Sequence, residues 1–408
     1  MEYIPRTLER KFWKAASTFK AVMVTGARQV GKSTMLKHLA EGQKRTFVTL
    51  DDPNVRTLAQ TDPILFFQTF TPPVLIDEVQ KAPELFEQIK LLCDETEERG
   101  LFWLTGSQSK KLRRLAGDTL AGRLGVLTLY SFSQKELYGA SPEETLDLSF
   151  SALADRVERA PTNNILSTFD QIFRGGMPDA QGLDDESLRL YFESYVETYL
   201  MRDAVDDNGI TNLEGFRRFL CACAAFNGQL LNYQDLGAAA DVSGVTAKDW
   251  VRVLQSMGIL TLLEPFSTNE LSRLVKTPKL YFNDTGLCAY LSSWTTRDVL
   301  MNGAAAGHYY EAFVVGSFLR EQAYGPAAMN VNYYRDRDKR EIDLVLETDG
   351  VLHPIEIKKS ANPDKRAIRT FRTLERTNKV IGNGGIVCMA EKPFPIDETN
   401  CLIPSNLI

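Results

Sequence analysis

The sequence predicts an α/β fold over residues 1–140, built on a parallel β-sheet with helices on both faces. Three observations support this prediction. Short apolar runs alternate with helix-like segments, a glycine-rich loop joins the first apolar run to the next helix, and the third run ends in two acids. The expected strands are residues 21–24, 46–50, 74–77, 101–105 and 126–129.

The loop after the first strand has the residues and spacing of a phosphate-binding loop. Gly26, Gly31, Lys32 and Ser33 complete the Walker A pattern G-x-x-x-x-G-K-[ST] between a strand and a helix. The glycines let backbone N–H groups curl around a phosphate chain, and the following helix adds the positive end of its dipole. We prefer this interpretation to a glycine-rich turn without a chemical role. The residues expected to contact a nucleotide are Gly26, Ala27, Arg28, Gln29, Val30, Gly31, Lys32, Ser33 and Thr34, together with Asp77.

The third strand ends in the acids Asp77 and Glu78, as a Walker B segment does. Asp77 and the Ser33 hydroxyl are expected to hold a magnesium ion beside the phosphates. Glu78 is expected to orient and polarise the attacking water, and Lys32 to reach the β- and γ-phosphates. Acids at a strand end are also common in solvated turns. The phosphate-binding loop at Gly26 favours the catalytic interpretation of Asp77 and Glu78 over the solvated turn.

The fourth strand leads into a polar turn that contains Ser107. A hydroxyl at this point is expected to sense the γ-phosphate, and Ser107 is the first choice, with Thr105 the second. The alternative is a turn that does not touch the nucleotide.

Arg123 is a candidate arginine finger, because a planar and permanently charged group suits a developing phosphoryl charge. It could act on its own site or on that of a neighbouring subunit, and the alternative is a surface arginine. A basic segment precedes it, with Lys110, Lys111, Arg113 and Arg114.

The 408 residues carry a net charge of −6, with 44% hydrophobic and 25% charged residues, which is typical of a globular protein of several domains. An acidic balance does not indicate general nucleic-acid binding, so only local basic segments are candidates. No apolar run reaches the roughly 20 residues that cross a bilayer, and no signal-peptide pattern is present. The six cysteines lack metal-binding spacing. We therefore expect a cytoplasmic location and no membrane partner.

Four parts are expected along the chain: residues 1–140, 141–206, 207–295 and 296–408. The second is predicted to be a helical lid or connector packed on the first sheet. The third has three helices and a hairpin, the layout of a winged helix. Its presumed recognition helix has only Lys248 and Arg252 as cations, so DNA contact and packing against protein are equal alternatives.

The last part holds a second group of acids. Asp343 lies on one expected strand, and Glu356 and Lys358 lie two residues apart, hence on one face, of the strand paired with it. Asp343 and Glu356 are expected to hold one divalent cation, and Lys358 to orient or activate water. Glu311, on the preceding helix, is expected to add a further metal ligand. The alternative is a surface ion-pair network.

Over nearly its full length the chain resembles a family of prokaryotic AAA+-like ATPases that end in a region of uncharacterised function called DUF4143. This resemblance implies ATP and Mg²⁺ at the N-terminal site. The acids at 311, 343 and 356, with Lys358, also resemble the PD-(D/E)xK nuclease motif, which implies a nuclease-like α-β-β-β-α-β core using Mg²⁺ or Mn²⁺. The family resemblance rests on residues 26–33, 50–53, 76–80, 104–107, 120–123, 175–178, 202–203 and 281–287.

The sequence therefore predicts an ATP-binding and ATP-hydrolysing protein whose nucleotide state controls a DNA-directed C-terminal region with conditional nuclease activity. ATP is expected at a subunit boundary of a homo-oligomer. The alternative is a regulatory switch or remodeller that acts on a protein partner and never cuts nucleic acid. The acidic balance and the cation-poor recognition helix support that alternative.

Overall fold

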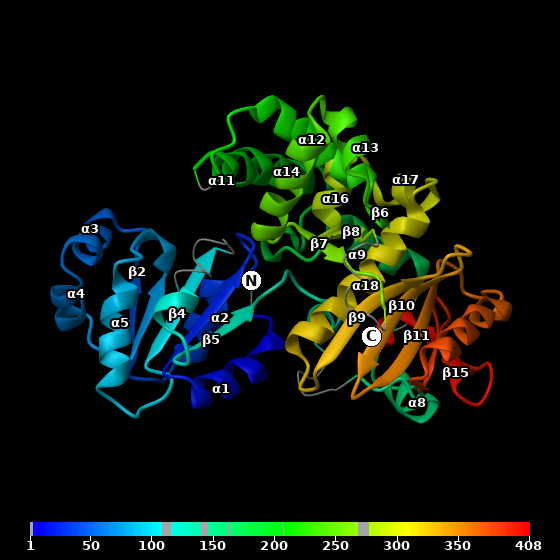
Figure 1. Ribbon diagram of the computed structural model, residues 1–408, viewed down its shortest axis with the longest axis horizontal. Helices are drawn as coiled ribbons and strands as arrows, with labels where there is room; N and C mark the ends of the chain where they lie inside the picture. The colour runs from blue at the N-terminus through cyan, green and yellow to red at the C-terminus, as the bar shows by residue number, and fades with distance from the viewer. Residues whose placement is uncertain (1–2, 108–115, 140–145, 162–163, 207, 268–276) are drawn as a thin grey trace. The chain divides into compact units, whose positions relative to one another are not determined.

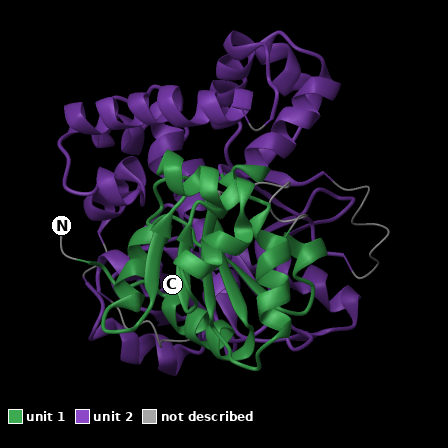
Figure 2. Cartoon of the chain, turned by 90° about the vertical axis from the view of Figure 1, so that its left-hand side faces the viewer, with its two compact units in different colours: residues 1–132, 141–143, 256–258 green, residues 133–140, 144–255, 259–408 purple. Residues whose placement is uncertain are grey.

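The computed structural model describes all residues except 1–2, 108–115, 140–145, 162–163, 207 and 268–276 (Figure 1). The chain forms two compact units, which Figure 2 distinguishes by colour. The first consists mainly of residues 1–132, and the second mainly of residues 133–140, 144–255 and 259–408. In the described part of the chain, no helix combines the length and the apolar character needed to span a membrane.

The first unit contains a five-stranded sheet in the order β2-β3-β4-β1-β5. All neighbouring strands are parallel, which confirms the predicted α/β class. The strands are β1 (Ala21–Gly26), β2 (Thr46–Thr49), β3 (Val74–Asp77), β4 (Phe102–Ser107) and β5 (Leu124–Thr128). The helices are α1 (Leu8–Thr18), α2 (Lys32–Ala40), α3 (Pro53–Thr61), α4 (Pro63–Thr69), η1 (Val79–Lys81) and α5 (Leu85–Asp94).

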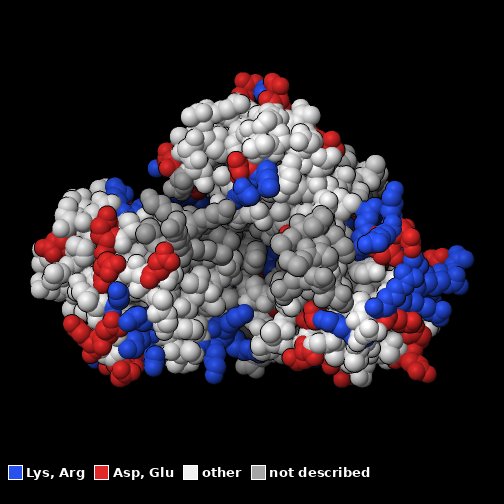
Figure 3. Space-filling model, viewed as in Figure 1, with Lys and Arg blue, Asp and Glu red and all other residues white. Residues whose placement is uncertain are grey.

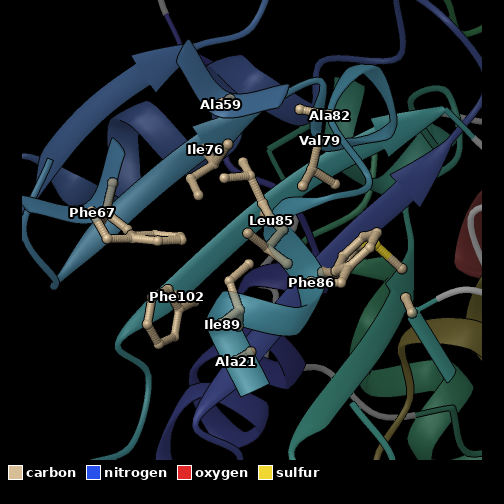
Figure 4. Packing of buried hydrophobic residues seen from close by; sticks show 14 of the residues in the cluster. Ala21, Ala59, Phe67, Ile76, Val79, Ala82, Leu85, Phe86, Ile89 and Phe102 are labelled. Carbon is tan, nitrogen blue, oxygen red and sulfur yellow. The ribbon is translucent and has the colours of Figure 1, made fainter. Parts of the chain in front are cut away.

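Alternate residues of the three central strands fill the core on one face of this sheet, because side chains on a strand point to opposite faces in turn. They form one buried cluster with residues of α3, α4 and α5 (Figure 4). On the other face, Trp103 packs edge-on against Phe12 of α1, with ring centroids 4.7 Å apart. Because helices cover both faces, the polar site residues lie where the strands end. The strand residues of the cluster include Ala21, Met23, Val74, Ile76, Phe102 and Leu104.

The helices between the first sheet and residue 206 belong to the second unit, where they pack among themselves and on later helices. The buried face of α9 (Ile165–Arg174) packs against α16 (Thr285–Leu291), α17 (Arg297–Asn302) and α18 (Ala306–Tyr324). The role of residues 141–206 as a lid or connector on the first sheet stays a prediction. The other elements here are α7 (Gln134–Leu137), α8 (Phe150–Val157), η2 (Pro178–Ala180), α10 (Asp185–Tyr195), the π-helix η3 (Val196–Leu200) and α11 (Met201–Asp206).

The next part of the second unit has three helices and a three-stranded antiparallel sheet in the order β6-β8-β7. The helices and the β7–β8 pair follow the expected layout, whereas β6 was not expected. Assignment as a winged helix stays a prediction. The elements are α12 (Leu213–Ala225), β6 (Gln229–Leu230), α13 (Tyr233–Ala240), α14 (Gly244–Ser256), β7 (Leu260–Leu263) and β8 (Lys279–Phe282).

The C-terminal part is a mixed sheet of seven strands, with β14-β15-β13-β11-β10-β9 as its main path and β12 beside β11. From α18 onwards, the order through β9, β10, β11, η4 and β13 is the expected one. Asp349 and Gly350 join β10 to β11 with φ values of 52° and 81°, as a tight hairpin turn requires. The elements after α18 are β9 (Met329–Arg335), β10 (Glu341–Thr348), β11 (Val351–Lys358), η4 (Lys365–Thr377), β12 (Val380–Ile381), β13 (Gly384–Cys388), β14 (Phe394–Pro395), β15 (Asn400–Pro404) and η5 (Ser405–Leu407).

Candidate functional site

The loop between β1 and α2 lies at the carboxyl end of the first sheet. Gly26 approaches the chain after β5 so closely that a Cβ there would lie 2.2 Å from the carbonyl oxygen of Leu129. Gln29 and Gly31 both have left-handed backbone conformations, with φ values of 60° and 93°. The chain therefore curls tightly just before α2 begins at Lys32, which places the N-terminus of the helix at the loop.

Lys32 is held inside this loop. Its side chain is buried, and its Nζ donates hydrogen bonds to the carbonyl oxygens of Ala27 at 2.7 Å and Gly26 at 3.2 Å. Both acceptors belong to the loop itself. The structure thus places the ammonium group within the loop that the sequence predicts to bind a phosphate chain.

Asp77 is surrounded by hydroxyl groups from three different elements. Ser33 of α2 and Thr105 of β4 both donate to its Oδ1, the latter at 2.6 Å, and Thr49 of β2 donates to Oδ2 at 3.3 Å. Asp77 is itself buried. The register of the parallel strands causes this convergence, because neighbouring strands end at one edge of the sheet.

The contact between Ser33 and Asp77 fits a magnesium ion. Mg²⁺ prefers hard oxygen ligands and usually takes only one or two from the protein, with water and phosphate oxygens completing its shell. Ser33 and Asp77 supply two such oxygens beside the loop. The donor set therefore agrees with the predicted cation.

Glu78 follows Asp77 in a left-handed conformation, with φ 59° and ψ 43°. This conformation costs a residue other than glycine about 1 kcal/mol or more, and such strain is concentrated at functional sites. The carboxylate is half-buried and accepts a hydrogen bond from Gln80 Nε2 at 2.5 Å. The backbone N–H of Glu78 donates to Thr105 Oγ1 at 3.0 Å. Glu78 therefore lies at the same sheet edge as Asp77.

Arg6 is a supporting residue that the sequence did not reveal. It is almost fully buried, and its guanidinium donates to the carbonyl oxygens of Val30 at 2.8 Å and Tyr130 at 2.6 Å. It also stacks over the Phe132 ring, 4.5 Å from the ring centroid. One side chain thus ties the phosphate-binding loop to the end of β5. A single arginine before a helix gives no pattern that predicts this role.

Ser107 is the last residue of β4, and its backbone lies beside Gly26 of β1. Its side chain lies outside the described part of the structure. The basic segment that was expected to follow it also lies there, with Lys110, Lys111, Arg113 and Arg114. The γ-phosphate role of Ser107 therefore stays a prediction.

Arg123 lies at the opposite end of the sheet from the loop. Its carbonyl accepts a hydrogen bond from Ala21, the first residue of β1, and the loop begins after five further residues, or about 17 Å of strand. Its guanidinium forms a bidentate pair with Asp94, at 2.6 and 2.9 Å, and this hydrogen bonding lowers the pKa of the Asp94 carboxyl. An arginine finger acting on its own loop does not fit this position. Action on a neighbouring subunit stays a prediction.

In the second unit, the structure brings Asp343, Glu356 and Lys358 together. Leu344 of β10 pairs with Ile355 of β11 in an antiparallel ladder, and Asp343 and Glu356 are the next residues along this ladder. Lys358 Nζ lies 2.5 Å from Glu356 Oε1 and 3.6 Å from Asp343 Oδ2. The sequence predicted this grouping from the alternation of side chains on the two strands.

Burial raises the pKa of both carboxyl groups in this cluster. The pKa of Glu356 rises to about 7, because the group is buried and Asp343 lies beside it. The pKa of Asp343 is raised by burial and then by Glu311. Burial lowers the pKa of Lys358, but the neighbouring carboxylates outweigh that effect and hold it above its ordinary value.

Lys279 also belongs to this cluster, although no pattern in the sequence predicts it. It is buried on β8, where its Nζ lies 2.9 Å from Glu311 Oε1 and 2.7 Å from Glu341 Oε1. Tyr281, two residues along the same strand, donates to the same Glu311 oxygen at 2.6 Å. Lys279 and Tyr281 alternate with apolar residues on β8, so the sequence predicts that they share one face of the strand. It does not predict that both contact Glu311.

Glu311 therefore accepts hydrogen bonds from a lysine and a tyrosine, and its role as a further metal ligand stays a prediction. Within the described residues, no group of three or more His, Cys, Asp or Glu side chains is arranged to hold a metal. The pair Asp343 and Glu356 still fits a hard cation, because Glu356 Oε2 is buried and has no hydrogen-bond partner among the described residues. The two carboxylates and Lys358 are the part of the expected centre that the structure brings together.

Three known families match parts of the chain. Residues 18–138 match a family described as an AAA domain, and this match contains the loop, Asp77 and Glu78. Residues 166–298 match a domain of unknown function, DUF8612, and residues 306–408 match another, DUF4143. Glu311, Asp343 and Glu356 fall in the DUF4143 match, whereas Lys279 falls in the DUF8612 match.

Two curated relatives, both described as uncharacterized proteins, come from Mycobacterium bovis and Mycobacterium tuberculosis. Each is 27% identical over 390 residues, which is 95% of this chain and 80% of the relative. Among solved structures, the Walker-type ATPase of Pyrococcus abyssi is similar with 13% identity, a TM-score of 0.45, and coverage of 71% of this chain and 96% of that one. The RuvB Holliday junction branch migration motor of Thermotoga maritima has 17% identity, a TM-score of 0.30, and coverage of 62% and 88%.

Proposed function

We propose that this chain, an AAA-like ATPase that carries a C-terminal DUF4143 region, hydrolyses ATP to control a DNA-directed activity of its C-terminal part. The observation that carries the proposal is the convergence of Ser33, Thr105 and Thr49 on the buried carboxylate of Asp77, beside the loop that holds Lys32. Such a preorganised set of oxygens next to a phosphate-binding loop is the equipment of ATP hydrolysis.

Each residue of the first site has a distinct role in the proposal. The loop N–H groups and Lys32 bind the phosphates, and Ser33 with Asp77 would hold Mg²⁺. When bound, the ion offsets the charge of the phosphates and orients them for in-line attack. Glu78 holds the attacking water by accepting its hydrogen bond. Arg123 would contribute from a neighbouring subunit of a homo-oligomer, because it lies far from its own loop.

The second site is proposed to act on phosphodiester bonds. Asp343 and Glu356 would hold Mg²⁺ or Mn²⁺, which would offset charge on the scissile phosphate. Lys358 would orient water, and the position of its Nζ within 4 Å of both carboxylates supports this role. Lys279 and Tyr281 would position Glu311, to which both donate hydrogen bonds.

One observation favours a second function, a regulatory switch or remodeller that acts on a protein partner. Arg252, one of the two cations of α14, is paired with Asp249 at 2.9 Å, and Lys248 lies 6.0 Å from the centre of the Tyr233 ring. Both interactions compete with phosphate contact. The second function would use the same ATPase site.

The central experiment measures DNA affinity in different nucleotide states. Purified full-length protein is titrated against labelled duplex and single-stranded DNA with ADP, with a slowly hydrolysed ATP analogue, and without nucleotide. We expect the wild-type protein to change its affinity with nucleotide and Lys32→Ala to lose that response. Glu78→Gln should bind ATP, hydrolyse it at least 100-fold more slowly, and stay in the ATP-bound affinity state. Lys37→Ala, on the exposed side of α2, is the matched control.

Equal DNA affinity in every nucleotide state would contradict the proposed coupling. No DNA binding at low salt, together with retained ATP turnover, would favour the protein-directed switch. Nuclease activity is tested separately on linear, nicked, branched and single-stranded DNA with Mg²⁺ or Mn²⁺. Cleavage that persists in both Asp343→Ala and Lys358→Ala would exclude this site as its source.

A further inference from the structure

The segment η4 presents arginines in a regular row. It is a 3₁₀-helix of 13 residues, and in such a helix residues three apart lie directly above one another. The sequence of this segment repeats with the same period of three. The inward row is Ile368, Phe371 and Leu374, and the outward row, all exposed, is Arg366, Arg369 and Arg372.

Side-chain hydrogen bonds support this tight helix along its length. Thr370, Thr373 and Thr377 each donate to the carbonyl oxygen three residues earlier, at 3.0, 2.6 and 2.6 Å. Asp364 caps the start by accepting from the Arg366 N–H at 2.9 Å. The backbone that carries the arginines is therefore fixed by several independent contacts, and the spacing of the row is a property of the fold.

Most of the positive charge on η4 is free to meet a ligand. Arg366 pairs with Asp364, but Arg369, Arg372 and Arg376 are exposed and form no ion pair with any residue in the described ranges. Figure 3 shows Lys and Arg side chains gathered on the right of the view, over the orange part of the chain in Figure 1. Glu375 is the one acid among the thirteen residues 365–377. The exposed side of η4 is therefore basic in an otherwise acidic protein, although acidic side chains border it in Figure 3.

The arginine row flanks the carboxylate pair. Ala367 and Ile368 of η4 pack against a buried cluster that contains Ile386 and Cys388 of β13. The parallel register places Glu356 beside Ile386 and Lys358 beside Cys388. Because paired residues of parallel strands point to the same face, the start of η4 covers the sheet face that carries Glu356 and Lys358, one strand away.

We infer that the row Arg366, Arg369 and Arg372 of η4 binds the phosphate backbone of DNA and delivers it to the site at Glu356 and Lys358. Arg376, on the neighbouring face of the helix, adds charge near the end of the row, where Glu375 occupies the next position. This inference rests on the proposed function and names the surface that performs its DNA contact. Successive arginines of the row rise by about 6 Å, since a 3₁₀-helix advances roughly 2 Å per residue. The phosphates of a DNA strand are also regularly spaced, and long, flexible arginine side chains can reach successive ones.

The same helix is poorly built for a membrane surface. Helices that bind at a lipid interface bury their apolar face in the bilayer. Here Phe371 and Leu374 are buried in the protein core against Ile342, Val345 and Leu352. Only the basic face is available to a partner, which favours a regular polyanion.

The experiment measures DNA affinity by fluorescence anisotropy, using the full-length protein and a labelled 30-base-pair duplex from 50 to 300 mM salt. Arg369→Gln with Arg372→Gln is the test variant, and Arg369→Lys with Arg372→Lys keeps the charge. Lys248→Gln with Arg252→Gln removes two cations from α14 and is the matched control. Thermal melting and ATP turnover verify that every variant is folded.

We expect the double glutamine variant to bind at least 10-fold more weakly at 100 mM salt. The slope of log affinity against log salt should become shallower by about 2, because two phosphate contacts are lost. The double lysine variant should recover most of the affinity, and the α14 variant should bind like the wild type.

Wild-type affinity in the glutamine variant, or loss of binding only in the α14 variant, would overturn this inference and leave the proposed function standing. If the wild type does not bind the duplex at 50 mM salt, both this inference and the proposed DNA-directed function are wrong. Loss of binding to polyglutamate or to anionic vesicles, but not to DNA, in the glutamine variant would assign the row to another partner.

Discussion

Thr105 donates a hydrogen bond from its Oγ1 to Asp77 Oδ1 at 2.6 Å, and Thr105 Oγ1 in turn accepts a hydrogen bond from the backbone N–H of Glu78 at 3.0 Å. A single hydroxyl on β4 thus positions both acids at the end of β3. Because donor and acceptor roles of the hydroxyl are both used, its orientation is fixed. Thr105 is therefore a positioning residue for the residue proposed to hold Mg²⁺ and for the residue proposed to orient water.

Thr105→Val should reduce ATP turnover while the protein stays folded. Valine has the shape of threonine but cannot donate to Asp77, so the carboxylate loses a buried hydrogen bond worth about 1–3 kcal/mol. We expect a 10- to 100-fold lower turnover and a higher Mg²⁺ concentration at half-maximal rate. Thr105→Ser keeps the hydroxyl and should recover most of both quantities. A Mg²⁺ titration of turnover checks this prediction, and an unchanged half-maximal concentration in the valine variant would contradict it.

Arg6→Met should destabilise the first unit. The variant loses two hydrogen bonds from a buried guanidinium and leaves the carbonyls of Val30 and Tyr130 without that donor, a change of about 3 kcal/mol. The melting temperature should fall by on the order of 10 °C. ATP should also raise the melting temperature of this variant by less than that of the wild type, because the phosphate-binding loop has lost the contact with Arg6. Lys14→Met, on the exposed side of α1, is the control. Equal melting temperatures of both variants would show that Arg6 does not stabilise the loop.

The first site could be predicted closely because its residues are adjacent in sequence. Gly26 to Ser33 form one loop, and Asp77 lies at the end of a strand whose partner ends at the same edge. The sequence determines such local geometry through backbone conformation and strand polarity. Arg6 and Thr105 were harder to assign, since their roles depend on which of several nearby groups they face after folding.

The second site was predicted only in part, because one of its residues comes from a distant strand. Asp343, Glu356 and Lys358 follow from pairing across a short hairpin. Lys279 of β8 meets Glu311 and Glu341 only through the packing of the sheet β6-β8-β7 against the C-terminal part, for which the sequence has no local signal. The 3₁₀ character of η4, by contrast, has a local counterpart in the sequence, because its arginines and its apolar residues both recur every three positions.

Arg123 should be required in trans if it serves ATP hydrolysis. Its distance from its own loop means that Arg123→Ala should leave ATP binding intact and lower turnover by on the order of 1,000-fold. Mixing this variant with Lys32→Ala, which lacks a working loop but retains the arginine, should restore turnover that neither shows alone. Asp94→Asn frees the arginine and should not lower turnover. Inactive mixtures that demonstrably co-assemble would rule out the finger role.

Glu356 should make the stability of the second unit fall as the pH rises from about 4.5 to about 7. Its pKa in the folded protein is about 7, against an ordinary value of 4.5, because the group is buried beside Asp343. Between those values the folded state keeps a proton that the unfolded chain has released, so the free energy of unfolding decreases with pH. The loss is at most on the order of 3 kcal/mol, since each pKa unit corresponds to about 1.4 kcal/mol.

Glu356→Gln removes this titration and should therefore melt at a higher temperature than the wild type at pH 8, with the difference shrinking towards pH 4.5. The difference between the two proteins is the measured quantity, because other carboxyl groups titrate in both and cancel. Glu391→Gln, on an exposed loop, should follow the wild type at every pH.

If the wild type and Glu356→Gln melt in parallel across this range, the carboxyl group is ionised throughout and Lys358 compensates its burial in full. In that case the pair of Asp343 and Glu356 carries a permanent charge of −2 beside the ammonium, and the affinity of the site for Mg²⁺ or Mn²⁺ should not change between pH 6 and 8.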